Sequence, residues 1–147
     1  PANPRSYNVG ELEAFAATPG VHLLGRRTDI ADLLADHHAF ILPSRGGEGL
    51  PRALLEAAAA RRPAIVTDVP GCGEFVIDGE TGFVAAQGSV AALADAIGRA
   101  AGADLASMGA AARARVERSG AVEIVGGQVV AIYRALLDAD GVRAVVA

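Results

Sequence analysis

The sequence predicts an α/β protein in which a parallel sheet lies between two layers of helices. Short apolar runs alternate with segments of helical periodicity, and turn residues separate them, as in successive parallel βα units. The run AFILP at 39–43 is continuous and apolar, which is typical of a strand buried on both faces of a sheet. With 147 residues the chain can bury a sizeable core, and we expect residues 1–147 to form one domain.

The elements expected before residue 44 follow from capping and turn residues. Asn8 is expected to cap a helix that runs through Phe15, because Glu11 completes a capping-box pattern. The other elements expected here are a short strand at 21–25 (VHLLG), a helix capped by Asp29 over residues 30–34, and the strand at 39–43.

The stretch SRGGEGLPRALLEA at 44–57 predicts a glycine-rich turn that leads into a helix. Pro51 favours the first helical turn, and an apolar stripe at i, i+3, i+4 and i+7 is expected to pack on the sheet through Leu50, Ala53, Leu54 and Ala57. The later elements are expected to be a buried strand at 63–68, a tight loop at 69–74, a turn at Asp78-Gly79, a strand at 82–84, and helices at 89–101, 104–118 and 121–138. The last two helices are expected to contribute Met108, Val116, Ile124, Val125, Ile132, Leu136 and Leu137 to the core.

Composition restricts the class of partner and the compartment. The net charge of −4 gives no long-range attraction to nucleic acid or anionic lipid, so nucleic acid is not expected as a partner. Cys72 is the only cysteine, which excludes an intrachain disulfide, and we expect a cytoplasmic location. No apolar stretch reaches the roughly 18 residues expected of a membrane span, so any membrane association would be peripheral.

The order of strand, glycine-rich turn and helix favours a bound phosphate. Unpaired amides of a first helical turn and the positive end of the helix dipole both attract an anion. The residues from Ser44 to Gly49 match neither G-x-G-x-x-G nor a Walker loop, so dinucleotide and NTPase sites fit poorly. Glu48 would repel a phosphate that touched it, so we expect it to contact an uncharged, hydroxyl-rich group beside the phosphate.

Glu56 lies off the predicted buried stripe, on the side of the helix that also carries Arg52. In one interpretation, Glu48 and Glu56 are two acceptors that flank an anion site, which suits a nucleotide-diphosphate sugar. In the other, Glu56 forms only an i, i+4 ion pair with Arg52, and Glu48 only compensates the helix dipole. Spacing alone leaves both interpretations open.

Longer motifs resemble a known family. The segments LPSRGGEGLPRALLEAAAARRPAIVTD (42–68) and GCGEFVIDGETGFV (71–84) resemble the C-terminal, donor-binding domain of family 4 (group 1) retaining glycosyltransferases of the GT-B type. Glu48 and Glu56 match the Glu-x7-Glu hallmark of that family. Residues 21–44 resemble the two preceding βα units, and QVVAIYRALL (128–137) resembles the closing helix. The resemblance implies a three-layer α/β/α, Rossmann-like parallel sheet.

The same resemblance assigns roles to residues. It implies that Glu48 is the catalytic residue, which contacts the hydroxyls of the transferred sugar, and that Glu56 binds the ribose hydroxyls of the nucleotide. The implied ligands of the diphosphate and sugar are the turn residues Ser44, Gly46, Gly47, Gly49 and Leu50, with Arg45 as a further phosphate ligand, while Gly25, Arg26 and Arg27 lie against the base. A retaining transfer of this kind is implied to need no protein nucleophile, no cofactor and no metal, and His22, His37 and His38 suggest no ligand set.

Two features depart from the family pattern. Arg61 stands where a glycine is usual, at the end of the predicted helix, where glycine relieves backbone strain. In the family, two strands and a helix that supply an arginine and a lysine precede the segments matched here, and an acceptor domain precedes them. All 13 basic residues of this chain are arginines. We therefore expect a fragment that lacks its first strands and its N-terminal acceptor domain, and that is inactive alone.

The missing strands would lie between VHLLG and AFILP, so we expect exposed strand edges and either rearranged pairing or a swapped homodimer. The expected parent enzyme transfers a sugar during polysaccharide or glycolipid synthesis. Two alternatives stay open. One is a sugar-nucleotide epimerase of the same architecture, and the other is a non-catalytic nucleotide-binding module of a bipartite glycosyltransferase.

Overall fold

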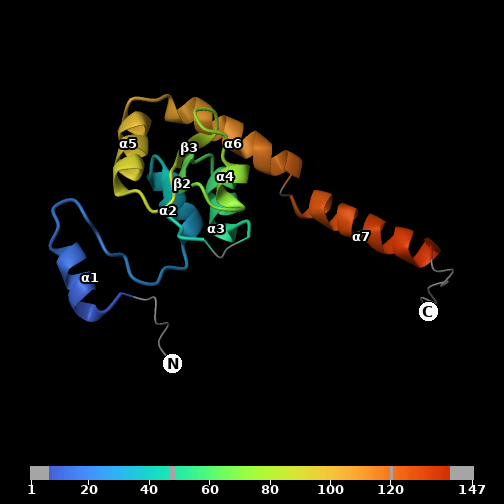
Figure 1. Cartoon of the computed structure of the whole chain (residues 1–147), viewed down its shortest axis with the longest axis horizontal. Helices are drawn as coiled ribbons and strands as arrows, with labels where there is room; N and C mark the ends of the chain where they lie inside the picture. Colours follow the sequence, from blue (N-terminus) through green and yellow to red (C-terminus); the bar gives the residue numbers. More distant parts are fainter. Residues whose placement is uncertain (1–6, 47–48, 120, 140–147) are drawn as a thin grey trace. The chain divides into compact units, whose positions relative to one another are not determined.

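The structure is a computed structural model, and it describes residues 7–46, 49–119 and 121–139 (Figure 1). The chain divides into two compact units, Pro1–Ile30 and Ala31–Ala147. The sheet and the cores lie in the second unit.

The first unit contains helix α1, Val9–Ala16, which begins where the capping box predicts. The Asn8 side chain accepts a hydrogen bond from the Glu11 amide at 3.0 Å, and the Glu11 carboxylate accepts one from the Asn8 amide at 2.7 Å. The strand predicted at 21–25 is wrong, because these residues form no regular structure and their apolar side chains are exposed. The physical reason is that a strand needs a hydrogen-bonded neighbour, and none of the described strands pairs with this segment.

The second unit is built on a parallel sheet with the order β1-β2-β3. Its strands are β1 (Phe40–Leu42), β2 (Ala64–Thr67) and β3 (Gly82–Ala85), and the register aligns Ile41, Ile65 and Phe83. All of β2 is buried, as predicted. The prediction that the strand at 39–43 is buried on both faces is wrong for Ile41, which is 43% exposed. Within the described residues β1 has a neighbour on one side only, so it is an edge strand.

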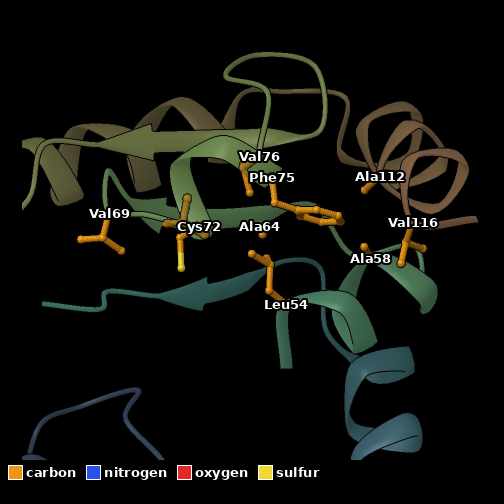
Figure 2. Packing of buried hydrophobic residues seen from close by; sticks show 10 residues of the cluster. Leu54, Ala58, Ala64, Val69, Cys72, Phe75, Val76, Ala112 and Val116 are labelled. Carbon is orange, nitrogen blue, oxygen red and sulfur yellow. The ribbon is translucent and has the colours of Figure 1, made fainter. Parts of the chain in front are cut away.

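Alternation along β2 places two cores on opposite faces of the sheet, which confirms the three-layer prediction. On one face, Ala64 and Val66 pack with α3 (Arg52–Ala59), α4 (Cys72–Phe75) and α6 (Leu105–Ser119). Figure 2 shows Ala64 within this cluster. On the other face, Ile65 packs with Phe83, with α5 (Val90–Ala101) and with Met108 of α6. The prediction that residues 69–74 form only a loop is wrong, because the four residues directly after Gly71 form the short helix α4.

Helix α3 buries a face that differs from the predicted stripe. Leu54 and Ala57 are fully buried as predicted, and Ala58 joins them. Leu50 and Ala53 are exposed, so these two predictions are wrong. The reason is that Leu50 precedes the N-cap residue Pro51 and is not on the helix, while the buried face turns toward α6.

The end of α3 is a tight turn around Arg61. The Arg62 amide donates to the Ala57 carbonyl at 2.9 Å, and the Arg61 amide donates to the Ala58 carbonyl at 3.0 Å. These two bonds form a Schellman motif, in which the C′ residue adopts left-handed backbone. Here that residue is Arg61, with φ of 58°, and it is the non-glycine residue with positive φ among the described residues. The sequence prediction that Arg61 occupies a position suited to glycine is confirmed.

The C-terminal helix α7 (Val122–Ala139), which follows α6 along the chain, has the predicted bounds within about one residue but not the predicted burial. Met108 and Val116 of α6 are buried as predicted. The five core residues predicted in α7 are between 37% and 60% exposed, so that prediction is wrong: Ile124, Val125, Ile132, Leu136 and Leu137. The stretch Leu105–Asp138 is long and apolar enough to pass as a membrane span by length and composition, and this contradicts the expectation from apolar runs. Length and composition alone do not assign a membrane to it.

Candidate functional site

The predicted ligand loop lies between β1 and α3, at the carboxyl end of the parallel sheet. Ser44, Arg45 and Gly46 follow the strand, and Gly49 and Leu50 precede the helix. Gly46 has φ of 101°, a conformation that side-chain-bearing residues rarely adopt. The predicted residues Gly47 and Glu48 lie outside the described residues. The strand, glycine turn and helix are therefore arranged as the sequence predicts.

Two side chains from neighbouring strand ends bind carbonyl groups of this loop. The hydroxyl of Thr67, the last residue of β2, donates to the Ser44 carbonyl at 2.5 Å. The amide group of Gln87, two residues after β3, donates to the Arg45 carbonyl at 2.9 Å. Thr67 is 5% exposed, so its hydroxyl bond is largely shielded from water. The start of the loop is thereby tied to two strands that follow it in the sequence.

The end of the loop is in close contact with the turn before α4. Gly71 has φ of 82°, and a Cβ atom there would lie 2.2 Å from the Gly49 carbonyl oxygen and 2.9 Å from the Leu50 nitrogen. Such distances are far below van der Waals contact, so only glycine fits at position 71 without movement of the backbone. The two loops pack backbone against backbone.

Among the described residues, no side chain caps the first turn of α3. Its N-cap residue, Pro51, has extended backbone and offers no side-chain acceptor to the helix amides. An N-cap without such an acceptor leaves amide donors of the first turn for water or for a bound anion. The Arg45 side chain, on the same loop, is exposed and has no ion-pair partner within the described residues. The uncapped helix start and the exposed arginine thus belong to consecutive parts of the chain, the helix and the loop before it.

Glu56 forms the ion pair that sequence spacing allowed. The Arg52 guanidinium donates to its carboxylate at 2.7 Å, and the two side chains are 90% and 39% exposed. Both residues line a groove of about 300 Å³ whose walls come from α3, α6 and the start of α7. Among the described residues of the 44–50 loop, none lines this groove. The structure therefore contains the ion pair and does not test the ribose contact.

The predicted base-binding turn lies in the first unit. Arg27 donates to the Asp29 carboxylate through two nitrogen atoms, one at 2.8 Å. The hydrogen bonds from Arg27 are the main reason that the pKa of Asp29 is below its usual range, and they raise the pKa of Arg27. The turn also includes Gly25, with φ of 63°, and the exposed Arg26. The contact of Gly25, Arg26 and Arg27 with a nucleotide base stays a prediction.

Metal ligation was not expected from the sequence. Among the described residues, no three or more His, Cys, Asp or Glu side chains gather in a way that could hold an ion. The imidazole of His37 is within hydrogen-bond distance of the Leu33 carbonyl, at 2.6 Å. Cys72 is fully buried.

Sequence reasoning missed Thr67, Gln87 and Gly71. The contact between Gln87 and Arg45 joins residues 42 positions apart, and no local pattern signals it. The sequence predicted only that Gly71 lies in a turn. A glycine that follows a buried strand can, however, indicate that another backbone segment approaches closely. All three become apparent only when the register of β1, β2 and β3 is known.

The fold and the loop define the class of protein. An open parallel α/β sheet that carries a glycine-rich turn and a helix start at its carboxyl end is a Rossmann-like domain, and such domains bind ligands at that end. Residues 3–102, more than half of the chain, match the family of glycosyl transferases group 1. The chain belongs to that family.

Two relatives of the chain carry the names of glycosyltransferases. The chain is 39% identical, over 47% of its length, to N,N'-diacetylbacillosaminyl-diphospho-undecaprenol alpha-1,3-N-acetylgalactosaminyltransferase of Campylobacter jejuni, of which the match covers 18%. It is 29% identical, over 63% of its length, to the capsular polysaccharide biosynthesis glycosyltransferase CapM of Staphylococcus aureus, of which 24% is covered. The chain thus spans less than a quarter of these two relatives.

Solved structures agree with the fold. Sucrose-phosphate synthase from Thermosynechococcus elongatus aligns with 88% of this chain and 33% of its own, at a TM-score of 0.77 and 27% identity. Anabaena HepE in complex with UDP-glucose aligns with 86% of this chain and 36% of its own, at a TM-score of 0.74 and 24% identity. At that identity the HepE likeness supports the fold alone. The expected family and the α/β fold are both confirmed.

Proposed function

We propose that this chain supplies the donor half-site of a glycosyltransferase that transfers a sugar, with retention, from a nucleotide-diphosphate sugar to an acceptor. The observation that carries the proposal is the open amino-terminal end of α3 behind a glycine loop, in a chain that belongs to the glycosyltransferase family. Departure of a nucleoside diphosphate builds negative charge, and the helix amides together with Arg45 would stabilise it.

The proposed roles of the two glutamates follow from their chemistry. Glu48 contacts hydroxyls of the transferred sugar, and Glu56 accepts hydrogen bonds from the ribose hydroxyls after it releases Arg52. The exchange is feasible because an exposed i, i+4 ion pair contributes only about 0.3–0.5 kcal/mol. The acceptor is a polysaccharide or glycolipid precursor, as the names of the Campylobacter and Staphylococcus relatives suggest for those proteins. In the proposed enzyme, the domain that binds the acceptor would precede the donor half-site along the chain, and the enzyme would act in the cytoplasm.

Calorimetric titration of the chain with UDP, GDP and ADP tests the donor site. We expect one nucleotide to bind, and its affinity to fall by about 1–3 kcal/mol in Glu56→Ala, because ribose hydroxyls would lose a charged acceptor. Arg52→Ala is the matched control, since it removes the ion pair and keeps the carboxylate. Equal losses of affinity in Arg52→Ala and Glu56→Ala would assign Glu56 to the ion pair only. If none of the three nucleotides binds, the donor proposal for this chain is wrong.

Metal independence is part of the proposal. Stabilisation of the leaving diphosphate by backbone amides and arginine requires no cation. We expect the measured nucleotide affinity to be the same in EDTA and in millimolar Mg²⁺. A nucleotide affinity that rises at least tenfold with Mg²⁺ would contradict metal independence but not the proposal that the chain contains the donor site.

A further inference from the structure

We propose that Thr67 and Gln87 are positioning residues, which hold two consecutive carbonyls of the donor loop so that its amides face the ligand. This inference rests on the proposed donor site, and it adds residues that lie outside the family's glutamate motif. The two hydrogen bonds, from Thr67 to the Ser44 carbonyl and from Gln87 to the Arg45 carbonyl, carry it.

Because the peptide group is planar, a hydrogen bond that fixes the direction of its carbonyl also fixes the direction of the N–H in the same group. In a trans peptide the C=O and the following N–H point in opposite directions, and none of the described peptide bonds is cis. With the Ser44 carbonyl bound by Thr67, the Arg45 N–H points away from Thr67. With the Arg45 carbonyl bound by Gln87, the Gly46 N–H points away from Gln87. The hydrogen bonds to these two carbonyls therefore set the direction of the N–H groups of Arg45 and Gly46.

The side chains that restrain the loop, those of Thr67 and Gln87, come from distant parts of the sequence. Thr67 ends β2 and Gln87 follows β3, and their sequence separations from the loop are 23 and 42 residues. Thr67 is rigidly placed, because β2 is buried throughout and Thr67 pairs with Ala85 of β3. Contacts from the other two strands thus restrain the start of the loop after β1.

A separate contact restrains the other end of the loop. Gly71 lies against the backbone of Gly49 and Leu50, where a Cβ atom would overlap the Gly49 carbonyl oxygen. Residues of β2, of the turn after β2 and of the segment after β3 therefore contact the described residues at both ends of the loop. Preorganised donors stabilise developing charge better than mobile ones, because they need no reorganisation when the charge appears.

The test uses variants that remove one donor and keep the volume. Thr67→Val and Gln87→Met each lose the hydrogen bond, and Thr67→Ser restores the hydroxyl at position 67. Asp78→Asn is the control for general destabilisation, because Asp78 contacts Val84 and Arg99 and not the loop. Amide hydrogen exchange of the 44–50 segment is measured without ligand, and the affinity for UDP, GDP and ADP is measured in parallel.

We expect faster exchange in the 44–50 segment of Thr67→Val and Gln87→Met, and about 3- to 10-fold weaker nucleotide binding, the range of one lost hydrogen bond. Thr67→Ser and Asp78→Asn should match the parent chain in both measurements. Unchanged exchange in both donor variants would overturn the proposal, and so would faster exchange with unchanged affinity. If the parent chain binds none of the nucleotides, the donor function fails with the positioning role, while the exchange data still report whether the loop is held.

Discussion

The two ends of helix α3 differ in how their backbone groups are satisfied. At the carboxyl end, the Ala57 and Ala58 carbonyls accept bonds within the turn, and the Arg113 guanidinium binds the Ala59 carbonyl. At the amino end, Pro51 provides no capping side chain, and the glycine loop lies in front of the first turn. The closed end contributes to stability, whereas the open end keeps its donors for a ligand. Substitutions at the two ends should therefore affect different properties.

The largest effect is expected for Gly71→Ala, at the open end. Its Cβ would overlap the Gly49 carbonyl, and its φ of 82° strains any side-chain-bearing residue. We expect a loss of about 3 kcal/mol in unfolding free energy by denaturant titration, together with a loss of nucleotide binding. Gly79→Ala is the control, because it has a similar φ of 77° with open space around the Cβ position. A similar loss in both variants would show that backbone strain, and not contact with the loop, causes the effect.

Gly109→Ala tests the closed end. A Cβ atom at this position of α6 would lie 2.1 Å from the Arg61 carbonyl oxygen, so α6 would have to move away from the turn. We expect a loss of about 1–3 kcal/mol in stability by thermal and chemical unfolding. Gly98→Ala, in an open position of α5, should instead raise stability by about 0.5–1 kcal/mol. If Gly109→Ala is as stable as the parent chain, the close packing of α6 on this turn is wrong.

Arg61→Gly should increase stability. Left-handed backbone costs a side-chain-bearing residue about 1–2 kcal/mol, and glycine avoids that cost while it keeps both bonds of the turn. We expect a gain of about 1 kcal/mol in unfolding free energy, with unchanged nucleotide affinity. Arg61→Ala, which keeps the strain and removes the side chain, should show no such gain.

A smaller effect is expected from pH. The hydrogen bond from Arg99, followed by that from the Val84 amide, holds the pKa of Asp78 below its ordinary value of 3.8, against partial desolvation. A lowered folded pKa adds stability that is fully present above about pH 4 and is lost as the pH falls through the folded pKa. Because Asp78 is 46% exposed, we expect no more than about 0.2–1 kcal/mol. Acid unfolding of Asp78→Asn should lack this component, and an identical acid profile would contradict it.

Local patterns in the sequence predicted elements in both units. The capping box at Asn8 and the buried strand β2 were predicted from neighbouring residues, whereas the glycine-like position of Arg61 was predicted from the resemblance to the family. The predictions of a strand at 21–25 and of buried side chains in α7 are wrong for a common reason. Both segments are apolar, but an apolar segment is buried only where another element covers it. A strand needs a paired strand and an apolar helix face needs a covering surface.

The site shows a similar division. The position of the loop between β1 and α3 could be predicted, because strand, glycine turn and helix follow one another in the sequence. The side chains that hold the loop, Thr67 and Gln87, could not be predicted, because their contacts depend on the order and register of the sheet. The ion pair of Glu56 was one of two interpretations, and spacing alone could not choose between them.

The central claim is that the loop at the open end of α3 binds the diphosphate of a donor. The most direct measurement is NMR mapping of backbone amide shifts in the full 147-residue chain during addition of the tightest-binding nucleoside diphosphate. The account predicts that the largest shifts occur at Arg45, Gly46, Gly49, Leu50 and the first turn of α3. Shifts centred on the groove between α3 and α6, with none in the loop, would contradict it.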